Sequence, residues 1–477
     1  MSPVSERAAQ VRFRRALSLM AMTLIAPGSA QLVAGNRRIG TVAFRIWLGL
    51  LAVGLATVVA LVADRGLALT LAFNTSLLLL VKLVLFALAI GWAALFVDAW
   101  RIGAPLSYGL RHRRASVAVN GLLCFGVAGT LLFGAHLVGV QRDLTLALSG
   151  SGGSSSAHDG RINVLLMGGD SGDGRWGLRP DSMNIASIDV ETGRTVLVAL
   201  PRNMAQFPFK EGSVMAEQFP QGFDCDGCYL NGVSTWAQDH TDLFPDSDNP
   251  GVDATIMGIE GITGLSINYW AMVNLQGFKD LVNAVGGVTL TVRQPIPVGG
   301  LGSDVTGYID PGTRKLDGFE TLWYARAREG SDDYSRMARQ KCVMSAMLSQ
   351  VSPQKVVTNF ASLAKASAAM ISTNIPAGDF DTLAELALKA RGQKISPLSL
   401  VPPMINTGDP DIDLVQSKVA EAIDRAEGNA PAAPAPSTKK AKKKQAPSTG
   451  DAVTGGSIGS LSEGYAANQA DDLSASC

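Results

Sequence analysis

The stretch Ile162-Asn-Val-Leu-Leu-Met167, followed directly by Gly168-Gly169-Asp170, decides the fold class of this chain. Its short, mostly apolar run is typical of a buried strand, and the glycines allow a sharp turn where the strand ends. Residues 183–190 alternate in polarity and residues 195–200 are apolar, which predicts two further strands joined by a turn at Glu191-Thr192-Gly193. A globular unit therefore begins close to the first of these strands.

Helix-like and strand-like segments are mixed through the rest of this unit. Helices are expected at residues 251–264, 278–285, 316–324 and 333–351, strands at residues 267–275 and 288–292, and two or three more helices within residues 353–426. This mixture predicts a layered α/β/α sandwich around a central mixed sheet, extending over residues 161–428. In such a fold the functional site is expected at the ends of the strands.

Residues 1–145 are mostly apolar and predict an α-helical transmembrane anchor. Residues 42–63, 76–100 and 116–140 are each long enough to span a bilayer, which takes about 20 apolar residues. A fourth apolar stretch, residues 16–33, is interrupted by proline and glycine. We expect a re-entrant or interfacial hairpin there rather than a full span.

Arginine clusters predict the orientation of this anchor. They precede and follow the expected hairpin and separate the last two spans, at Arg7, Arg12, Arg14, Arg15, Arg37, Arg38, Arg101, Arg111, Arg113 and Arg114. Because positively charged loops stay in the cytoplasm, three crossings leave everything after residue 140 outside. We therefore expect a multi-pass protein of the cell membrane, embedded in the lipid bilayer, with an extracytoplasmic domain.

Composition changes again at both ends of this outer domain. Residues 146–160 read as a flexible Gly/Ser linker, and residues 429–477, rich in Ala, Pro and Lys, are expected to be disordered because they cannot bury a core. Formal net charge is zero and only 17% of residues are charged, which excludes a globally basic nucleic-acid binder. No nucleic-acid partner is expected.

The cysteines and histidines do not have the spacing of a zinc site. Only Cys225 and Cys228 lie close together, separated by Asp-Gly. A loop-closing disulfide is favoured over free thiols if this domain lies outside the cytoplasm.

The densest group of candidate functional residues lies in Ser331-Asp-Asp-Tyr-Ser-Arg-Met-Ala-Arg-Gln340. In a helix, spacings of three, four and seven place four side chains on one face, those of Asp333, Arg336, Arg339 and Gln340. Upstream, Arg326 and Arg328 would point the same way in an extended segment. Four arginines in so few residues predict a dense anionic ligand such as a diphosphate, because arginine forks bind phosphate oxygens. The alternative is a surface helix held by salt bridges to neighbouring acidic residues.

Two aspartates lie where predicted strands meet. Asp170 follows the first strand and Asp181 precedes the second, so their carboxylates could hold one Mg²⁺, which prefers carboxylates and substrate phosphate oxygens. The alternative is that both aspartates cap turns. Arg202 follows the third strand and is expected to face the same crevice.

Eight motifs of the outer domain, in this order along the chain, resemble the LytR-CpsA-Psr family of bacterial cell-wall ligases. They are Asn163-Val-Leu-Leu-Met-Gly-Gly-Asp170, Arg179-Pro-Asp-Ser-Met183, Val198-Ala-Leu-Pro-Arg202, Ile267-Asn-Tyr-Trp-Ala-Met-Val-Asn-Leu-Gln-Gly-Phe278, Leu281-Val-Asn-Ala-Val-Gly-Gly-Val288, Pro311-Gly-Thr-Arg-Lys-Leu-Asp-Gly318, Tyr324-Ala-Arg-Ala-Arg328 and Asp333-Tyr-Ser-Arg-Met-Ala-Arg-Gln340. A membrane anchor before an outer domain is also typical of this family.

The resemblance implies a phosphotransferase. Family members join a glycopolymer from a polyprenyl-diphosphate carrier to a peptidoglycan hydroxyl through a phosphodiester, and they release polyprenyl phosphate. Asp170 and Asp181 resemble the family's Mg²⁺-associated acids, and Asp333 is the candidate for activating the acceptor hydroxyl. The remaining expected site residues surround the diphosphate, with Arg202, Arg326 and Arg328 in catalytic roles and Arg175, Arg179, Arg336, Arg339 and Gln340 in binding.

The resemblance also implies an apolar slot for the lipid tail, for which Trp270, Phe278 and Leu281 are either lining residues or ordinary core. The chain departs from the family at Asn203, where members usually have Asp, and Arg175 is the candidate for an arginine that members carry directly after the first Asp. An insertion at residues 207–249 is expected to shape acceptor recognition. Two alternatives to the ligase stay open, a polyprenyl-diphosphate hydrolase and a non-catalytic wall-binding or regulatory membrane protein.

Overall fold

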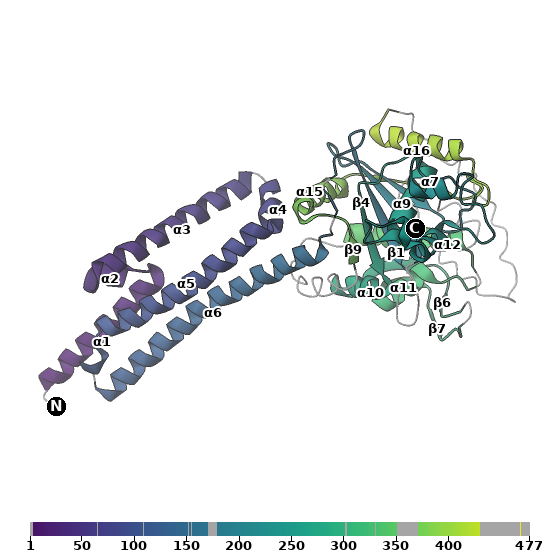
Figure 1. The fold of residues 1–477 in the computed structure, drawn as a ribbon. Coiled ribbons are helices and arrows are strands. Elements are labelled where there is room, and N and C mark those ends of the chain that lie inside the picture. The colour runs from purple at the N-terminus through teal and green to yellow at the C-terminus, as the bar shows by residue number, and fades with distance from the viewer. Residues whose placement is uncertain are drawn as a thin grey trace. The chain divides into compact units, whose positions relative to one another are not determined.

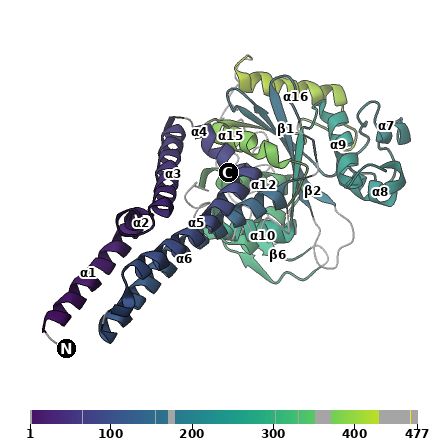
Figure 2. The same ribbon diagram turned by 60° about the vertical axis from the view of Figure 1, so that its left-hand side comes forward.

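The computed structural model describes residues 3–63, 65–107, 109–150, 152–153, 155–169, 179–300, 303–329, 331–350, 371–429 and 468. The chain divides into two compact units, Met1–Leu146 and Ala147–Cys477, each of which is described by itself (Figures 1 and 2).

The first unit is built from helices α1 (Pro3–Ile25), α2 (Ser29–Ala34), α3 (Arg37–Ala63), α4 (Arg65–Phe73), α5 (Thr75–Ile102) and α6 (Leu110–Leu148). By length and composition, three helical segments among the described residues could cross a membrane: Arg37–Ala63, Thr75–Ser107 and Leu110–Ala147. Each contains one of the three predicted spans.

Helices α1 and α2 form a hairpin at the interruption seen in the sequence. Gly28 has φ of 90°, and a β-carbon there would lie 2.7 Å from the carbonyl oxygen of Gly40, so only glycine fits this turn. Gln31 is buried and donates from Nε2 to the carbonyl of Leu95 at 3.0 Å. This bond attaches the hairpin to α5 and satisfies the Nε2 donor of the amide that interrupts the apolar stretch.

The second unit contains a six-stranded mixed sheet in the order β10-β3-β2-β1-β4-β9. Its strands are β1 (Arg161–Gly169), β2 (Pro180–Asp189), β3 (Thr195–Leu200), β4 (Tyr269–Asn274), β9 (Ile371–Thr373) and β10 (Ile395–Ser399). The β1–β2, β2–β3 and β4–β9 pairs are antiparallel, whereas β1–β4 and β3–β10 are parallel. The mixed sheet predicted from the sequence is therefore confirmed.

Helices cover both faces of this sheet, which makes the unit a layered sandwich (Figure 1). Leu165 and Met167 of β1 point into the main core, together with residues of α9 (Pro250–Thr263) and α16 (Ile412–Glu427). The alternate residues of β1 face the opposite layer, where Ile162 packs near α15 (Phe380–Arg391). Helices α10 (Leu275–Ala284), α11 (Gly318–Arg326) and α12 (Asp333–Gln350) complete that layer.

Several short strands differ from the prediction. Strand β5 (Val288–Val292) pairs with β8 (Gly312–Leu316) in a separate small sheet, and β6 (Ile296–Val298) pairs with β7 (Gly307–Ile309) in another. The expectation of only helices in residues 353–426 is wrong for its described part, because β9 and β10 join the central sheet there.

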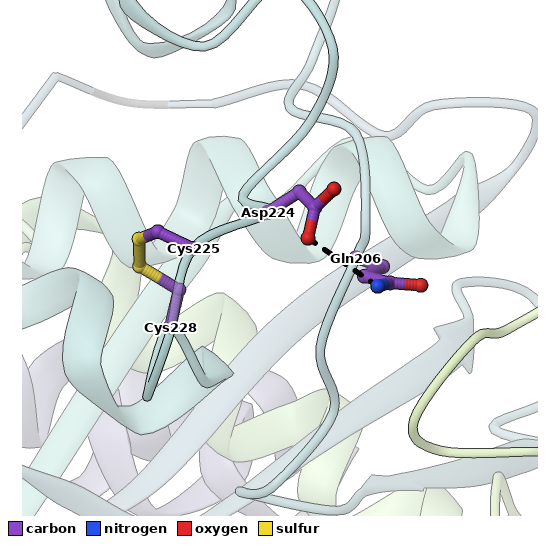
Figure 3. Close-up of a disulfide and its surroundings, with 4 residues drawn as sticks. All are labelled: Gln206, Asp224, Cys225 and Cys228. Carbon is purple, nitrogen blue, oxygen red and sulfur yellow. Dashed lines mark hydrogen bonds between the residues drawn. A yellow bond between two sulfur atoms is a disulfide. The ribbon is translucent and has the colours of Figure 1, made fainter.

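The segment predicted as an insertion forms two short helices, α7 (Val214–Gln218) and α8 (Val233–Asp239), around an aromatic cluster. The rings in mutual contact are Phe207, Phe209, Phe219, Phe223 and Trp236. Cys225 and Cys228 form the predicted disulfide on this segment, next to a hydrogen bond from Gln206 Nε2 to Asp224 Oδ1 of 3.3 Å (Figure 3).

Asn468 is the one residue of the C-terminal tail beyond residue 429 that the structure describes, and it is buried against α12. Its Nδ2 donates to the carbonyl of Tyr334 at 2.8 Å, and its own carbonyl accepts from Lys341 Nζ at 3.0 Å. The predicted disorder of the tail otherwise concerns residues outside those described.

Candidate functional site

Strand order brings the candidate residues to one edge of the sheet. Because β2 runs antiparallel to β1 and β3, the start of β2 lies beside the ends of both neighbours, as the pairs Gly168–Ser182 and Met183–Leu200 show. Asp181 therefore lies close to Arg202, which follows β3. Helix α12 begins at Asp333 and packs on β3 through a small cluster that includes Ala199 and Met337.

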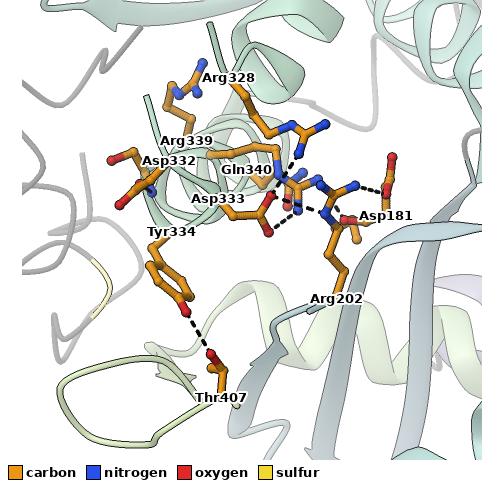
Figure 4. Close-up of polar contacts among 12 residues, drawn as sticks. Asp181, Arg202, Arg328, Asp332, Asp333, Tyr334, Arg339, Gln340 and Thr407 are labelled. Carbon is orange, nitrogen blue, oxygen red and sulfur yellow. Dashed lines mark hydrogen bonds and ion pairs between the residues drawn. The ribbon is translucent and has the colours of Figure 1, made fainter. Parts of the chain in front are cut away.

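One arginine links the sheet edge to α12. Arg202 donates from NH1 to Asp181 Oδ1 at 2.5 Å and from Nε to Asp333 Oδ1 at 3.2 Å (Figure 4). Arg336 donates from NH2 to Asp333 Oδ2 at 2.9 Å and from NH1 to the carbonyl of Asp181 at 2.8 Å. Arg328 NH1 lies 3.6 Å from Asp333 Oδ1. These five residues, Asp181, Arg202, Arg328, Asp333 and Arg336, are called the charged cluster below.

Charge and burial act in opposite directions on these groups. Burial by itself would raise the pKa of the Asp181 carboxyl, but the charges of Arg202, Arg336 and Arg328 and the hydrogen bond from Arg202 outweigh it, so this pKa lies below its ordinary value. Burial lowers the pKa of Arg336, and the charge of Asp333 offsets this only in part. Three guanidinium groups face two carboxylates, so the charged cluster keeps an excess of positive charge.

Arg336 has unused donor capacity at the centre of this cluster. Its side chain is 4% exposed. Its Nε is buried without a hydrogen-bond partner in the part of the chain that the structure describes. A buried donor of this kind is costly unless a ligand pairs with it. The observation that favours an anion ligand at Arg336 is that this residue lines two cavities, which are described below.

The other predicted residues occupy different positions around the cluster. Arg326 is the last residue of α11 and does not lie in an extended segment. The extended geometry from which a common direction of Arg326 and Arg328 was predicted is therefore wrong. Its guanidinium lies over the ring of Trp323, 5.6 Å from the centroid. Gln340 donates weakly to the carbonyl of Ala325 at 3.3 Å. Arg179 is exposed beside the cluster.

The structure separates Arg339 from the charged cluster. The side chain of Arg339 is fully buried, and it donates from NH1 to the carbonyl of Tyr324 at 2.9 Å and from NH2 to the carbonyl of Ala327. It therefore attaches α12 to the end of α11. The expectation that Arg339 binds the diphosphate is corrected, because its guanidinium is engaged by backbone carbonyls.

Two cavities meet at the charged cluster. One, of about 350 Å³, lies between the sheet and helices α10 to α12; its lining is mostly apolar and includes Leu166, Ala271, Val273, Phe278, Leu281, Leu322, Met344 and Met347. The other, of about 750 Å³, is lined largely by charged and polar residues, among them Arg179, Arg202, Asn203, Asn231 and Arg328. Asp181, Arg326 and Arg336 line both cavities.

Of the predicted lipid-slot residues, Phe278 and Leu281 line the apolar cavity. Trp270 instead packs in the main core at 4% exposure. The sequence reading missed Lys341, which follows Gln340 and lines the same cavity. Burial lowers the pKa of the Lys341 ammonium to about 7. The signal in the sequence for Lys341 was its position directly after Arg339 and Gln340, in a helix with a buried face.

Only part of the predicted metal site can be placed. Asp170 and Arg175 lie outside the described residues. Among those described, no group of three or more His, Cys, Asp or Glu side chains could hold a metal ion. Two features of Asp181 fit a metal ligand. The pKa of its carboxyl is lowered, and no described residue donates a hydrogen bond to its Oδ2.

Arg339→Met tests the structural assignment of this arginine. We expect the free energy of unfolding to fall by about 2 kcal/mol, because the buried carbonyls of Tyr324 and Ala327 lose their donors. Thermal unfolding of the purified chain in detergent measures this change. Arg391→Met, at an exposed position ending α15, is the matched control. Weaker diphosphate binding at unchanged stability would show instead that Arg339 contacts the ligand.

Curated relatives match about half of the chain. The chain is 25% identical over 268 residues to Biofilm regulatory protein A of Streptococcus mutans, covering 54% of this chain and 61% of that one. It is 28% identical over 200 residues to the polyisoprenyl-teichoic acid–peptidoglycan teichoic acid transferase TagU of Oceanobacillus iheyensis, covering 41% and 53%. The chain thus spans about three-fifths or less of the length of these relatives.

Solved structures match a similar share of the chain. Bacillus subtilis TagV is 23% identical and covers 58% of this chain and 100% of its own, with a TM-score of 0.41. TagT bound to LI-WTA is 19% identical and covers 59% and 99%, also with a TM-score of 0.41. The LytR_cpsA_psr family model matches residues 140–409, which is more than half of the chain, and the protein is therefore a member of the LytR-CpsA-Psr family.

Proposed function

We propose that this protein transfers a glycopolymer from a polyprenyl-diphosphate carrier to a peptidoglycan hydroxyl, forming a phosphodiester and releasing polyprenyl phosphate. The observation that carries this proposal is the meeting of an apolar and a polar cavity at an arginine cluster. A glycolipid diphosphate has the same three parts, with an apolar chain, a dense negative charge and a polar glycan. The names of the teichoic acid transferases among the relatives support the same class of reaction.

The arginines are proposed to bind the diphosphate. Arg336 lines both cavities, so we assign it to the phosphate nearest the lipid. Arg202 and Arg328 line the polar cavity and contact Asp333. Phosphoryl transfer depends mainly on positioning and on stabilising charge on the phosphate oxygens, which fixed guanidinium groups do well in a buried site.

Asp333 is proposed to receive the proton of the acceptor hydroxyl. Its two oxygens accept hydrogen bonds from Arg202 and Arg336, which fixes the carboxylate at the first residue of α12. As the acceptor oxygen bonds to the glycan-linked phosphorus, the bridging bond to the lipid phosphate breaks. The electron pair stays on polyprenyl phosphate, whose charge the arginines stabilise. Such a leaving group does not need a strong general acid.

A bound Mg²⁺ is proposed as the cofactor, held by Asp181 together with Asp170 and substrate phosphate oxygens. The ion would supply further charge neutralisation on the diphosphate. Asp181 is suited to this role because neighbouring arginines keep its carboxyl ionised. Arg202 meanwhile orients the carboxylate through Oδ1.

The membrane location is also proposed. The three apolar helical segments would anchor the protein in the bilayer that holds the lipid-linked donor. The arginine distribution would place the α/β unit outside the cell, on the side where peptidoglycan lies.

The full chain in lipid nanodiscs, with Mg²⁺ and a polyprenyl-diphosphate glycan, provides the test of this function. Release of polyprenyl monophosphate should require peptidoglycan fragments, and the glycan should become attached to them. Release at the same rate without fragments would favour a hydrolase. Absence of release from a folded, donor-binding protein would favour a non-catalytic role.

Arg336→Lys keeps the charge but removes the planar fork. We expect about tenfold weaker binding of a polyprenyl diphosphate, because a point charge cannot replace paired guanidinium contacts. Titration calorimetry measures the affinity. Arg314→Lys, on the half-exposed surface of β8, is the matched control. Unchanged affinity in the Arg336 variant would make that residue structural.

Asp181→Asn preserves the shape of the side chain and its acceptor for Arg202 but removes the negative charge. We expect turnover to fall by about 100-fold or more, and binding of Mn²⁺, followed by its electron paramagnetic resonance signal, to weaken. Asp310→Asn, whose side chain is 70% exposed, serves as the control. Normal Mn²⁺ binding and normal Mg²⁺ dependence in the Asp181 variant would exclude this residue as a ligand.

A further inference from the structure

The polar cavity contains a group of neutral side chains that the proposed phosphate chemistry does not use. Beyond the arginines, its lining includes Asn203, Tyr229 and Asn231. A diphosphate is matched by guanidinium groups, so these neutral residues indicate contact with a different part of the substrates.

Both asparagine side chains lack partners within the described part of the chain. Asn231 is only 7% exposed, and its carboxamide makes no hydrogen bond to a described residue. Asn203 Oδ1 is buried and is likewise without a partner there. Buried carboxamides are normally satisfied, and each carries both donors and an acceptor. Two carboxamides that line one cavity suit a ligand that both donates and accepts hydrogen bonds, such as a pair of vicinal hydroxyl groups.

Tyr229 supplies an aromatic surface beside these carboxamides. It is 45% exposed and lines the polar cavity, so much of its ring is free to contact a ligand. Trp323 lines the same cavity, but the guanidinium of Arg326 covers one face of its ring. Tyr229 is therefore the better candidate for packing against the apolar face of a ligand ring.

Backbone contacts hold this segment against the charged cluster. The amide of Asn231 donates to the carbonyl of Arg202 at 3.0 Å, and the amide of Leu230 donates to the carbonyl of Met204 at 2.9 Å. The Cys225–Cys228 disulfide closes the loop directly before Tyr229. The three neutral side chains are thus fixed relative to Arg202, which in turn contacts Asp333.

We propose that Asn203, Tyr229 and Asn231 form a subsite for a pyranose ring of the acceptor glycan, with the ring on Tyr229 and its hydroxyl groups on the two carboxamides. This inference rests on the proposed function. It assigns the acceptor rather than the donor sugar because the amide of Asn231 is bonded to the carbonyl of Arg202, whose guanidinium contacts Asp333, the proposed base for the acceptor hydroxyl. A neutral sugar ring uses both the donors and the acceptors of this set, whereas an ionised phosphate would use only the donors.

The test uses the full chain in nanodiscs, a polyprenyl-diphosphate disaccharide as donor and a peptidoglycan glycan oligosaccharide without stem peptides as acceptor. Tyr229→Ala and Asn231→Leu should each raise the KM for the acceptor about tenfold and change the KM for the donor by less than about twofold. Tyr229→Phe should retain most of the acceptor affinity, since it keeps the ring. Tyr308→Ala, at a 51% exposed position on β7, is the matched control.

The outcomes separate this inference from the proposed function. An unchanged acceptor KM in both variants, with normal turnover and normal thermal stability, overturns the subsite but leaves the ligase intact. An equal rise in the donor KM would assign the subsite to the donor sugar and overturn the acceptor assignment. If the wild-type chain shows no turnover, the proposed function fails. Direct titration of the oligosaccharide then decides the subsite alone, and wild-type binding that both variants retain, or no binding at all, overturns it.

Discussion

The bridge that Arg202 makes between Asp181 and Asp333 is the interaction on which the rest of the site depends. One carboxylate belongs to the start of β2 and the other to the start of α12, and a single guanidinium contacts both. Without this cation, the carboxylates would face each other with only the remaining arginines to separate them. The carbonyl of Arg202 also accepts from Asn231, so the same residue fixes a third segment of the chain.

The two cavities differ in character, although they share a boundary, because different elements of the fold line them. On one side, alternate residues of the central strands and the facing sides of α10 to α12 supply mostly apolar side chains. On the other side, loops after β3 and α11 supply the polar ones. Because both sets converge on Arg336, one buried guanidinium lies between a surface that suits hydrocarbon and a surface that suits water or sugar.

Much of the scaffold could be predicted because it depends on local patterns. The apolar run of β1, the alternation in β2 and the helical spacing from Asp333 onward each have a period that the sequence displays. Strands β9 and β10 could not be predicted in this way. Strand β9 has three residues, and β10 contains Pro397, which is tolerated because β10 lies at the edge of the sheet.

The site itself shows where sequence patterns stop being informative. Arg336 and Arg339 lie in one motif at a spacing of three, yet the first faces the charged cluster and the second faces the carbonyls that end α11. Their difference depends on what packs on each side of α12, which only the tertiary structure determines. No sequence pattern pointed to Asn231, because the cavity that it lines is formed by segments distant in sequence.

The contact between Asn468 and α12 bears on how the protein should be prepared and handled. The composition of the C-terminal region invites truncation after α16, yet Asn468 covers the ammonium of Lys341 and satisfies the carbonyl of Tyr334. Removing it would leave a basic group and a backbone acceptor uncovered next to the wall of the apolar cavity. Fusion tags and shortened expression variants at this end therefore act on the folded α/β unit, although the sequence there resembles a dispensable extension.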